Sequence, residues 1–182
     1  EAGYSFDGCA TTLPQRLGII MKRLGVPIVT VITQGAFHRD PLYNMLQIRN
    51  VKVSAHVKCI ATAEEVKEKS VEELDALLAE EFSFDNFAWQ RDNRISIDVP
   101  FRADGLHRIL YKCPHCGEEN QMEGRGIHLT CHACQKQWTM DEYGQLSADD
   151  GDTEYPHIPD WYQWQRDCVR KELEDGTYLL DT

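Results

Sequence analysis

The 182-residue sequence has no apolar run long enough for a membrane-spanning helix. No stretch approaches the ~18 apolar residues that such a helix needs, and no signal peptide opens the chain. Basic residues are also scarce, because 19 Lys and Arg face 30 Asp and Glu and give a formal net charge of −11. This charge disfavours binding to nucleic acid. We therefore expect a cytoplasmic protein with no transmembrane helix and no nucleic-acid partner.

The sequence also lacks the common short catalytic motifs. It has no Gly-rich phosphate loop, no Ser-His-Asp order and no zinc-protease helix. His38 follows the apolar run 26–32, where an α/β sheet would place a site, so it is a candidate general base. A histidine in a surface loop is the alternative interpretation. His56 lies on the polar face of an alternating segment, which predicts a solvated side chain.

Four of the seven cysteines form two Cys-x2-Cys pairs separated by fourteen residues, namely Cys113, Cys116, Cys131 and Cys134. Two such pairs present four thiolates in the tetrahedral arrangement that Zn²⁺ accepts. The fourteen-residue separation lies just below the usual window for such pairs and still indicates a zinc ribbon. Because four thiolates leave no open position for water, we expect a structural rather than a catalytic zinc site. The remaining three cysteines are an odd, widely spaced set that indicates free thiols in a reducing compartment.

The residues around the cysteine pairs predict a small three-stranded ribbon. Segments 120–123, 127–130 and 137–140 are expected to be strands, with a turn at Gly124–Gly126. Gly117 follows the first pair, where positive φ lets backbone N–H groups turn toward sulfur. Gln135 occupies the equivalent place after the second pair, so this half of the site is less ideal. His115 and His132 lie within the pairs and are expected to be solvated neighbours rather than ligands.

The first 110 residues predict an α/β fold. A helix over 13–24 ends at a glycine and leads directly into Val26–Ile32, a β-branched run typical of a strand buried on both faces. This order indicates one unit of a parallel α/β sheet. Alternation at 51–58 and 95–99 predicts two further strands, and capping boxes at Thr62 and Ser70 predict helix starts. The aromatic residues Phe84, Phe87 and Trp89 predict either core packing or the lining of an acyl groove.

We thus expect three parts: an α/β portion over 1–110, a zinc ribbon over 111–146, and an acidic linker with a C-terminal helix over 147–182. Asp160 is the expected cap of that last helix, predicted over 161–174. Since no long linker precedes the ribbon, we expect the ribbon to dock against the α/β portion.

The order of several segments carries a resemblance. The loop Glu1–Gly8, a helix and the Val-Pro strand 26–32 resemble the third and fourth sequence blocks of the glycerolipid (1-acylglycerol-3-phosphate, or lysophospholipid) acyltransferases. With the Cys-Pro-x-Cys ribbon and the Ile-Pro-Asp-Trp-Tyr helix start at 158–162, the order is similar to a bacterial subgroup with an appended ribbon. The resemblance covers almost the whole chain and implies an acyltransferase-like core.

In that family, a Glu and an Arg of the third block hold the acceptor phosphate. Glu1 and Ser5 match this block, but Gly3 or Tyr4 stands where the family carries Arg. No other residue of the block can make the same bidentate contact. The catalytic His-x4-Asp motif, in which His is the general base and Asp orients it, does not occur in this sequence. The resemblance implies that this motif lies upstream and that the present chain alone is inactive.

The resemblance implies a phospholipid-biosynthesis enzyme that moves an acyl group from acyl-CoA or acyl-carrier protein to a lysophospholipid or glycerol phosphate. It further implies peripheral contact with the inner membrane face. Two alternatives stay open. The ribbon could be a protein-interaction module on a non-catalytic α/β scaffold, or the chain could come from a degenerate paralogue that binds lipid without catalysis.

Overall fold

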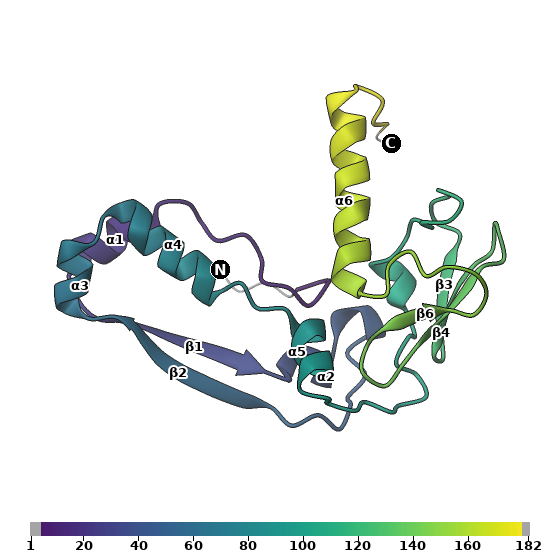
Figure 1. The fold of residues 1–182 in the computed structure, drawn as a ribbon, viewed down its shortest axis with the longest axis horizontal. Helices are drawn as coiled ribbons and strands as arrows, with labels where there is room; N and C mark the ends of the chain where they lie inside the picture. The colour runs from purple at the N-terminus through teal and green to yellow at the C-terminus, as the bar shows by residue number, and fades with distance from the viewer. Residues whose placement is uncertain (1–4, 180–182) are drawn as a thin grey trace.

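The structure is a computed structural model that describes residues 5–179, and it divides into two regions (Figure 1). Residues 5–94 form what we call the hairpin region, around a long two-stranded sheet. Residues 95–179 form the ribbon region, which holds a four-stranded sheet and the long C-terminal helix. The result is a mixed α/β fold with two small antiparallel sheets.

The hairpin region places three helices on one side of two antiparallel strands (Figure 1). Val31 of one strand lies directly opposite Val57 of the other. In chain order its elements are α1 (Leu17–Leu24), β1 (Ile28–Gln34), α2 (Ala36–Arg39), η1 (Leu42–Asn44), β2 (Ser54–Ala61), α3 (Ala63–Glu68), α4 (Val71–Glu81) and α5 (Asn86–Asp92).

The predicted parallel-sheet core is wrong. β1 pairs only with β2, and the pairing is antiparallel. The chain between them contains only short helical turns, α2 and η1, whereas the connection between two parallel strands is usually an α-helix that packs on the sheet. The β-branched run over 26–32 suggested a strand buried on both faces, but Val29 and Val31 are exposed. The apolar composition of this run therefore predicted a strand correctly, but the predicted burial of both its faces was wrong.

Two helices of the hairpin region, α3 and α4, begin where the sequence predicts, whereas α1 begins at Leu17 and not at residue 13. Thr62 and Ser70 both form complete capping boxes, with Glu65 and Glu73 as their partners. α1 packs closely against α4 at Gly18, where a Cβ atom would come within 2.4 Å of the Val71 carbonyl oxygen. A small cluster between helices and sheet stabilises this region; its buried members are Met21, Ala61, Val66, Leu74 and Leu78.

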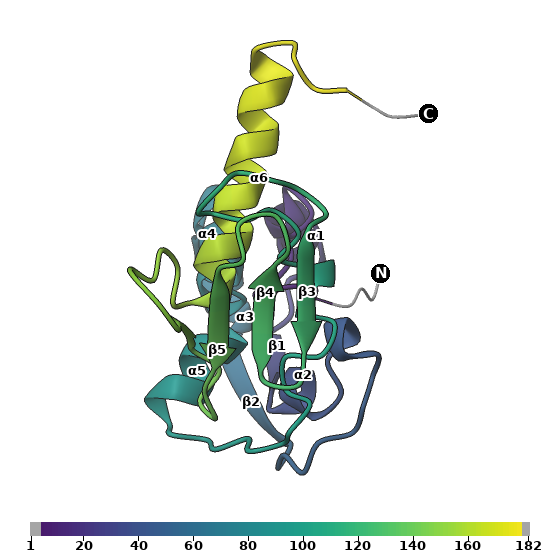
Figure 2. The ribbon, with the colours of Figure 1, turned by 90° about the vertical axis from the view of Figure 1, so that its right-hand side faces the viewer.

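The ribbon region contains the predicted strands and one more. The four strands pair in chain order, each antiparallel to the next (Figure 2). The elements are η2 (Leu106–Arg108), β3 (Met122–Arg125), β4 (His128–Cys131), β5 (Gln137–Met140), β6 (Leu146–Ala148) and α6 (Ile158–Glu174). The strand predicted over 95–99 does not form, and this segment is an irregular loop. The N–H of Ile97 donates to the Glu142 carbonyl, but this one bond does not make a strand pair.

One buried core joins the ribbon sheet, α6 and part of the hairpin region. Trp138 of β5 and Trp161 of α6 meet edge to face, with ring centroids 5.0 Å apart. Tyr43 and Phe87 from the hairpin region belong to the same cluster. The ribbon is thus docked through shared apolar packing, as the lack of a linker predicted.

α6 is docked only at its N-terminal end. It begins at Ile158, two residues before the predicted cap Asp160, and its last buried residue is Gln165. The rest of the helix projects away from the body (Figure 2). Among the described residues, no helix combines the length and apolar character needed to cross a membrane.

Candidate metal centre

The four predicted cysteines come together at one end of the ribbon sheet. All four sulfur atoms lie within 4.8 Å of one another. The Sγ atoms of Cys113 and Cys134 are 3.8 Å apart, and so are those of Cys116 and Cys131. A tetrahedral site with Zn–S bonds of ~2.3 Å has sulfur–sulfur edges of about 3.8 Å. The cluster therefore has the dimensions of a four-thiolate metal site, and its sulfurs are too far apart for disulfide bonds, which need ~2.05 Å.

Two equivalent backbone turns position the cysteines. In the first, the N–H of Gly117 donates to the Cys113 carbonyl at 2.9 Å, with φ of 80° at Gly117. In the second, the N–H of Gln135 donates to the Cys131 carbonyl at 2.8 Å, with φ of 65° at Gln135. Both turns need a left-handed residue, which glycine adopts freely and glutamine does not. The sequence-based expectation that the second half is less ideal agrees with this geometry.

The electrostatics of the cluster are uneven. Cys113 and Cys131 are buried, whereas Cys116 is exposed. Burial raises the pKa of the Cys113 thiol. Burial acts the same way on Cys131, but N–H groups of Cys134 and Ala133 stabilise its thiolate, so the pKa of Cys131 is lowered overall. Since a metal binds thiolates, the backbone N–H groups around Cys131 favour the form of this side chain that a metal requires.

The two histidines within the cysteine pairs face carboxylates instead of the cluster. His115 Nδ1 lies 3.3 Å from Glu154 Oε1, and His132 Nε2 lies 3.1 Å from Glu123 Oε2. Among the described residues, only the four cysteines gather in a group that could hold a metal ion. The histidines are therefore neighbours of the site, as predicted.

Lys112, the residue before the first cysteine, is clamped to α6. Its backbone N–H donates to Gln165 Oε1 at 3.0 Å, and its carbonyl accepts from Trp161 Nε1 at 2.9 Å. Gln165 also donates to the Ile109 carbonyl at 2.8 Å. These bonds satisfy the amide of Gln165, which is fully buried. The metal centre and α6 are thus connected through one residue.

Sequence analysis missed this contact, although it left a signal. Trp161 and Cys168 lie seven residues apart, the spacing at which an apolar stripe repeats along a helix. Gln165 lies four residues after Trp161, on the same helix face. A polar residue within an apolar stripe indicates a buried hydrogen-bonding role.

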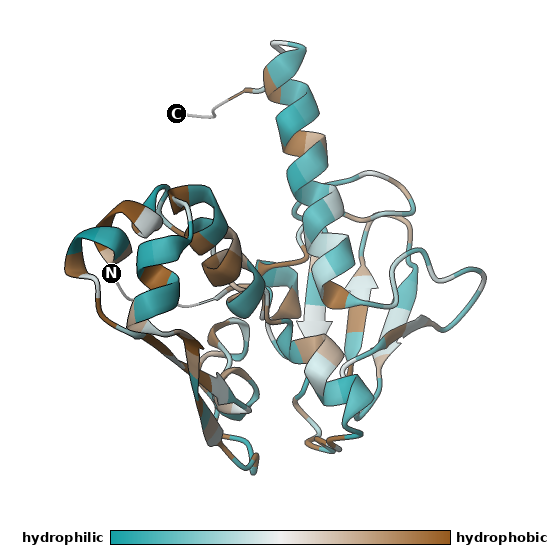
Figure 3. Cartoon of the chain, turned by 60° about the vertical axis from the view of Figure 1, so that its left-hand side comes forward, coloured by the Kyte–Doolittle hydropathy of each residue, from teal (hydrophilic) through white to brown (hydrophobic). Residues whose placement is uncertain are grey.

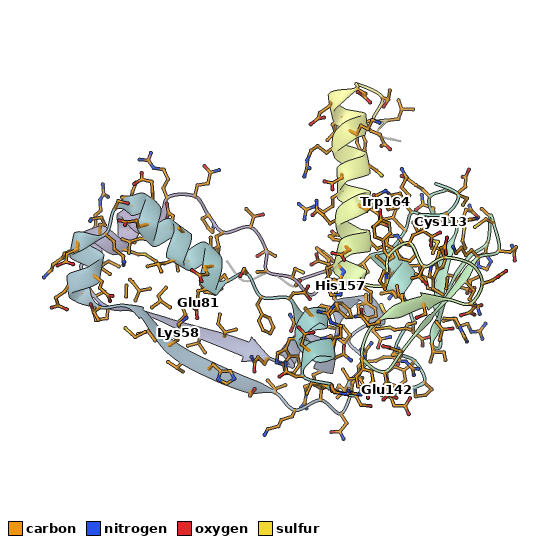
Figure 4. The ribbon with its side chains drawn as sticks, viewed as in Figure 1. Lys58, Glu81, Cys113, Glu142, His157 and Trp164 are labelled. Atoms are coloured by element: carbon orange, nitrogen blue, oxygen red, sulfur yellow. The ribbon has the colours of Figure 1, made fainter. Side chains whose placement is uncertain are left out.

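An ion pair joins the hairpin and ribbon regions. His157 Nε2 lies 2.7 Å from Asp85 Oδ2, at the meeting point of α5 and α6 (Figure 4). Asp85 is also the N-cap of α5 and accepts from the Ala88 N–H at 2.8 Å. Burial opposes the charged form, but bonds from His157 and Ala88 outweigh it, so the pKa of Asp85 is lowered. The seventy-one intervening residues hide this pair from sequence analysis.

Of the two residues suggested by the acyltransferase resemblance, only Ser5 belongs to the described part of the chain. Glu1 lies outside the described residues. Ser5 donates its hydroxyl to the Cys9 carbonyl at 2.6 Å and to Asp7 at 3.3 Å, within its own loop. The loop that follows borders an apolar groove of about 780 Å³ against α4, with Leu13, Phe82 and Phe84 among its lining residues.

His38 has a packing role, and the general-base interpretation is wrong. Its side chain is buried among aromatic rings, with Phe87 edge-on at 5.1 Å and Trp89 stacked at 6.3 Å. Nε2 lies 2.8 Å from the Asn86 carbonyl oxygen. At 1% exposure the ring has no access to a substrate. The same burial lowers the pKa of His38 to about 4.

His56 is exposed, as predicted, and its Nε2 lies 2.9 Å from Gln34 Oε1. Phe87 belongs to the core, whereas Phe84 faces the apolar groove. Core packing is thus confirmed for Phe87, and an acyl groove beside Phe84 stays a prediction.

Comparison of the chain with protein-family models, curated protein sequences and solved structures found no match.

Proposed function

We propose that the four cysteines hold one Zn²⁺ ion as a closed structural site. The observation that supports this proposal is the pair of 3.8 Å distances between sulfur atoms. In a tetrahedral zinc–thiolate site, neighbouring sulfur atoms are also about 3.8 Å apart. Sulfur ligands in tetrahedral geometry favour zinc over the oxygen-seeking cations Mg²⁺ and Ca²⁺. With four protein ligands the ion has no free position, so it stabilises the fold and takes no part in a reaction.

The ion would stabilise two things at once. It links the turn at Cys113–Cys116 to Cys131 at the end of β4 and to Cys134 in the connection between β4 and β5. It also fixes the position of Lys112, which contacts α6. Structural zinc supplies on the order of 10 kcal/mol of apparent binding free energy in small domains. We infer that the docking of α6 depends on metal through this connection.

Metal content and folding test the zinc proposal together. The purified chain should contain one zinc per molecule, and Co²⁺ replacement should give the absorption of a tetrahedral thiolate site. Cys131→Ser should lose the metal, whereas Cys59→Ser, which changes a cysteine on β2 far from the cluster, should keep it. A chain that is metal-free and still folds its ribbon sheet would contradict the proposal.

For the role of the whole protein, we propose the carboxy-terminal portion of an acyltransferase. The support is the order of sequence blocks, the Cys-Pro-x-Cys ribbon and the apolar groove beside the loop after Ser5. In this proposal, acyl-CoA or acyl-carrier protein donates the acyl group to a lysophospholipid or glycerol phosphate. The His-x4-Asp motif would come from sequence before Glu1, and contact with the inner membrane face would be peripheral.

Two measurements test this role. The upstream coding sequence should contain an open frame with His-x4-Asp, and a frame without it would end the enzymatic proposal. The protein made from the whole frame should transfer acyl groups from a thioester, and the 182-residue chain should not. Zinc content is unaffected by either result, so the two proposals fail independently.

A second candidate is a protein-interaction module built on the ribbon. The observation that favours it is the projecting end of α6, where Leu173 is exposed and none of the residues described between 166 and 179 is buried. The acidic net charge favours a protein partner over nucleic acid. One stoichiometric partner in a pull-down, without thioester turnover by the whole gene product, would favour this candidate over the enzyme.

A further inference from the structure

The sheet of the hairpin region has a mixed face toward the helices. Ile28 and Ala61 at one end of this face belong to the small core cluster. Farther along, Thr30 and Lys58 are opposite each other in the register, and both bind Glu81 at the end of α4, at 2.9 and 2.7 Å (Figure 4). Sheets packed on one side normally turn their apolar residues inward, whereas here polar side chains take up much of the covered face.

The opposite face, which we call the outer face, is apolar. Cross-strand pairs place Val29 beside Cys59, Val31 beside Val57, and Thr33 beside Ala55, and Val53 continues the same alternation beyond β2. The exposed fractions are 57% for Val29, 57% for Val31, 42% for Val53 and 70% for Val57. Figure 1 shows the described helices on the other side of the strands, and Figure 3 shows apolar colouring along this hairpin.

We propose that the outer face is a contact surface between two copies of this chain, packed sheet against sheet. Two identical faces related by a twofold axis meet with the same residues on both sides, the commonest arrangement for soluble dimers. Small β-branched side chains on a two-stranded sheet interdigitate across the ~10 Å spacing of packed sheets. The central contact would be the Val31–Val57 pair of each copy.

The absence of charge on this face favours a second copy over a charged partner. The residues of the outer face are aliphatic, Thr or Cys, in a chain with a net charge of −11. Two copies therefore meet without burying a carboxylate or an ammonium group, which would be costly without a partner. Lys58 and His56 stay on the other face, away from the contact.

The available area limits the strength of the contact. The four valines, Ala55 and Cys59 expose roughly 450 Å² per copy, so a dimer would bury about 900 Å² in total, at the low end for specific interfaces. We therefore expect a dissociation constant in the micromolar range. Because each copy carries the same net charge, added salt should tighten the dimer by screening their repulsion. A contact held by ion pairs would weaken instead.

Sedimentation of the zinc-loaded chain across micromolar concentrations tests the proposal. The wild-type mass should rise from 20.9 kDa toward twice that value as concentration increases. Val31→Lys and Val57→Lys should each raise the dissociation constant at least tenfold. Ile20→Lys is the matched control, because Ile20 is 56% exposed on α1, and it should leave the dimer unchanged. Circular dichroism and zinc content establish that each variant is folded.

Alkylation of Cys59 gives a second readout that needs no substitution in the core. Cys59 lies on the outer face beside Val29, so its reaction should slow as wild-type concentration rises and should stay fast in Val31→Lys. A wild-type chain that stays monomeric at the highest concentration, with Cys59 fully reactive, would overturn the proposal and leave the face to a different polypeptide. A dimer that survives both lysine substitutions would also overturn it.

Discussion

The two regions of the molecule differ in where they place their large apolar side chains. The ribbon region buries Trp138 and Trp161 completely and brings together four cysteines that could hold a metal ion. The hairpin region leaves three strand valines exposed and turns Thr30 and Lys58 toward its helices. The ribbon region therefore buries its large apolar side chains, in a core that also takes in Tyr43 and Phe87 of the hairpin region. The hairpin sheet instead presents an exposed apolar surface suited to a partner.

Metal removal should have the largest effect on the difference in stability between the two regions. Without zinc, the ribbon region loses on the order of 10 kcal/mol of apparent stabilisation, and we expect β3–β6 to unfold. The capped helices α3 and α4 do not contact the cluster and should stay folded. Hydrogen exchange after chelation should show lost protection in 122–148 and retained protection in 63–81. Equal loss in both regions would show that they form a single cooperative unit.

A core truncation in the hairpin region should have the next largest effect. Leu74 is buried between α4 and the sheet, so Leu74→Ala should cost about 3 kcal/mol of unfolding free energy. Ile20→Ala removes an exposed side chain of the same region and should change stability by less than about 0.5 kcal/mol. Urea unfolding followed by circular dichroism measures both. Equal effects would mean that the cluster is loosely packed.

The ion pair between the regions should give a smaller, pH-dependent effect. Asp85→Asn should cost about 1–2 kcal/mol near neutral pH by weakening the bonds to His157 and Ala88. Because the folded pKa of Asp85 is lowered, its contribution is present above the unfolded value of ~3.9 and lost as pH falls through the folded value. The wild type and Asp85→Asn should thus converge in acid.

Urea unfolding of both proteins across a pH series measures this convergence. Both proteins carry the same cysteines, so acid release of metal cancels in the difference. Asp98→Asn, which changes a largely exposed carboxylate, should behave like the wild type at every pH. A constant difference between wild type and Asp85→Asn would contradict the assigned linkage.

The smallest expected effect separates the two cysteine turns. Gln135→Gly should raise stability by about 1 kcal/mol, because glycine adopts the observed positive φ without strain. The reverse change at the equivalent place, Gly117→Gln, should lower stability by a similar amount. No atom lies within 4 Å of a Cβ built at Gly117, so that loss would be conformational. Thermal unfolding with zinc present checks both, and effects of the same sign would contradict the argument.

The ribbon could be predicted from sequence because its information is local. Four cysteines at short spacings determine which atoms meet, and glycine or glutamine at a fixed offset determines the turn. The capping boxes at Thr62 and Ser70 are local in the same way and are confirmed. β6 was missed because three residues, Leu146–Ala148, are too few to show an alternation pattern.

The features that failed depend on long-range pairing. The run Val26–Ile32 identifies a strand, but strand direction and exposure depend on β2, which begins twenty residues after β1 ends. His38 looked like a loop residue after a strand, yet the burial that removes it from chemistry comes from Phe87 and Trp89 of α5. Contacts between residues that are distant in the sequence produce no pattern in the spacing of neighbouring residues.

Because α6 is held near its N-terminal end, a small tilt there produces a larger movement at its other end. Side chains hold it at Trp161 and Gln165, and nine residues extend beyond Gln165. At 1.5 Å per residue, this free arm is ~13 Å long, so a tilt of ~20° at its base would swing the tip by on the order of 5 Å. The ion pair between Lys112 and Glu172 connects this free part of α6 to the ribbon. A slight rearrangement at the sulfurs would thus be amplified into a large displacement at the far end of the helix.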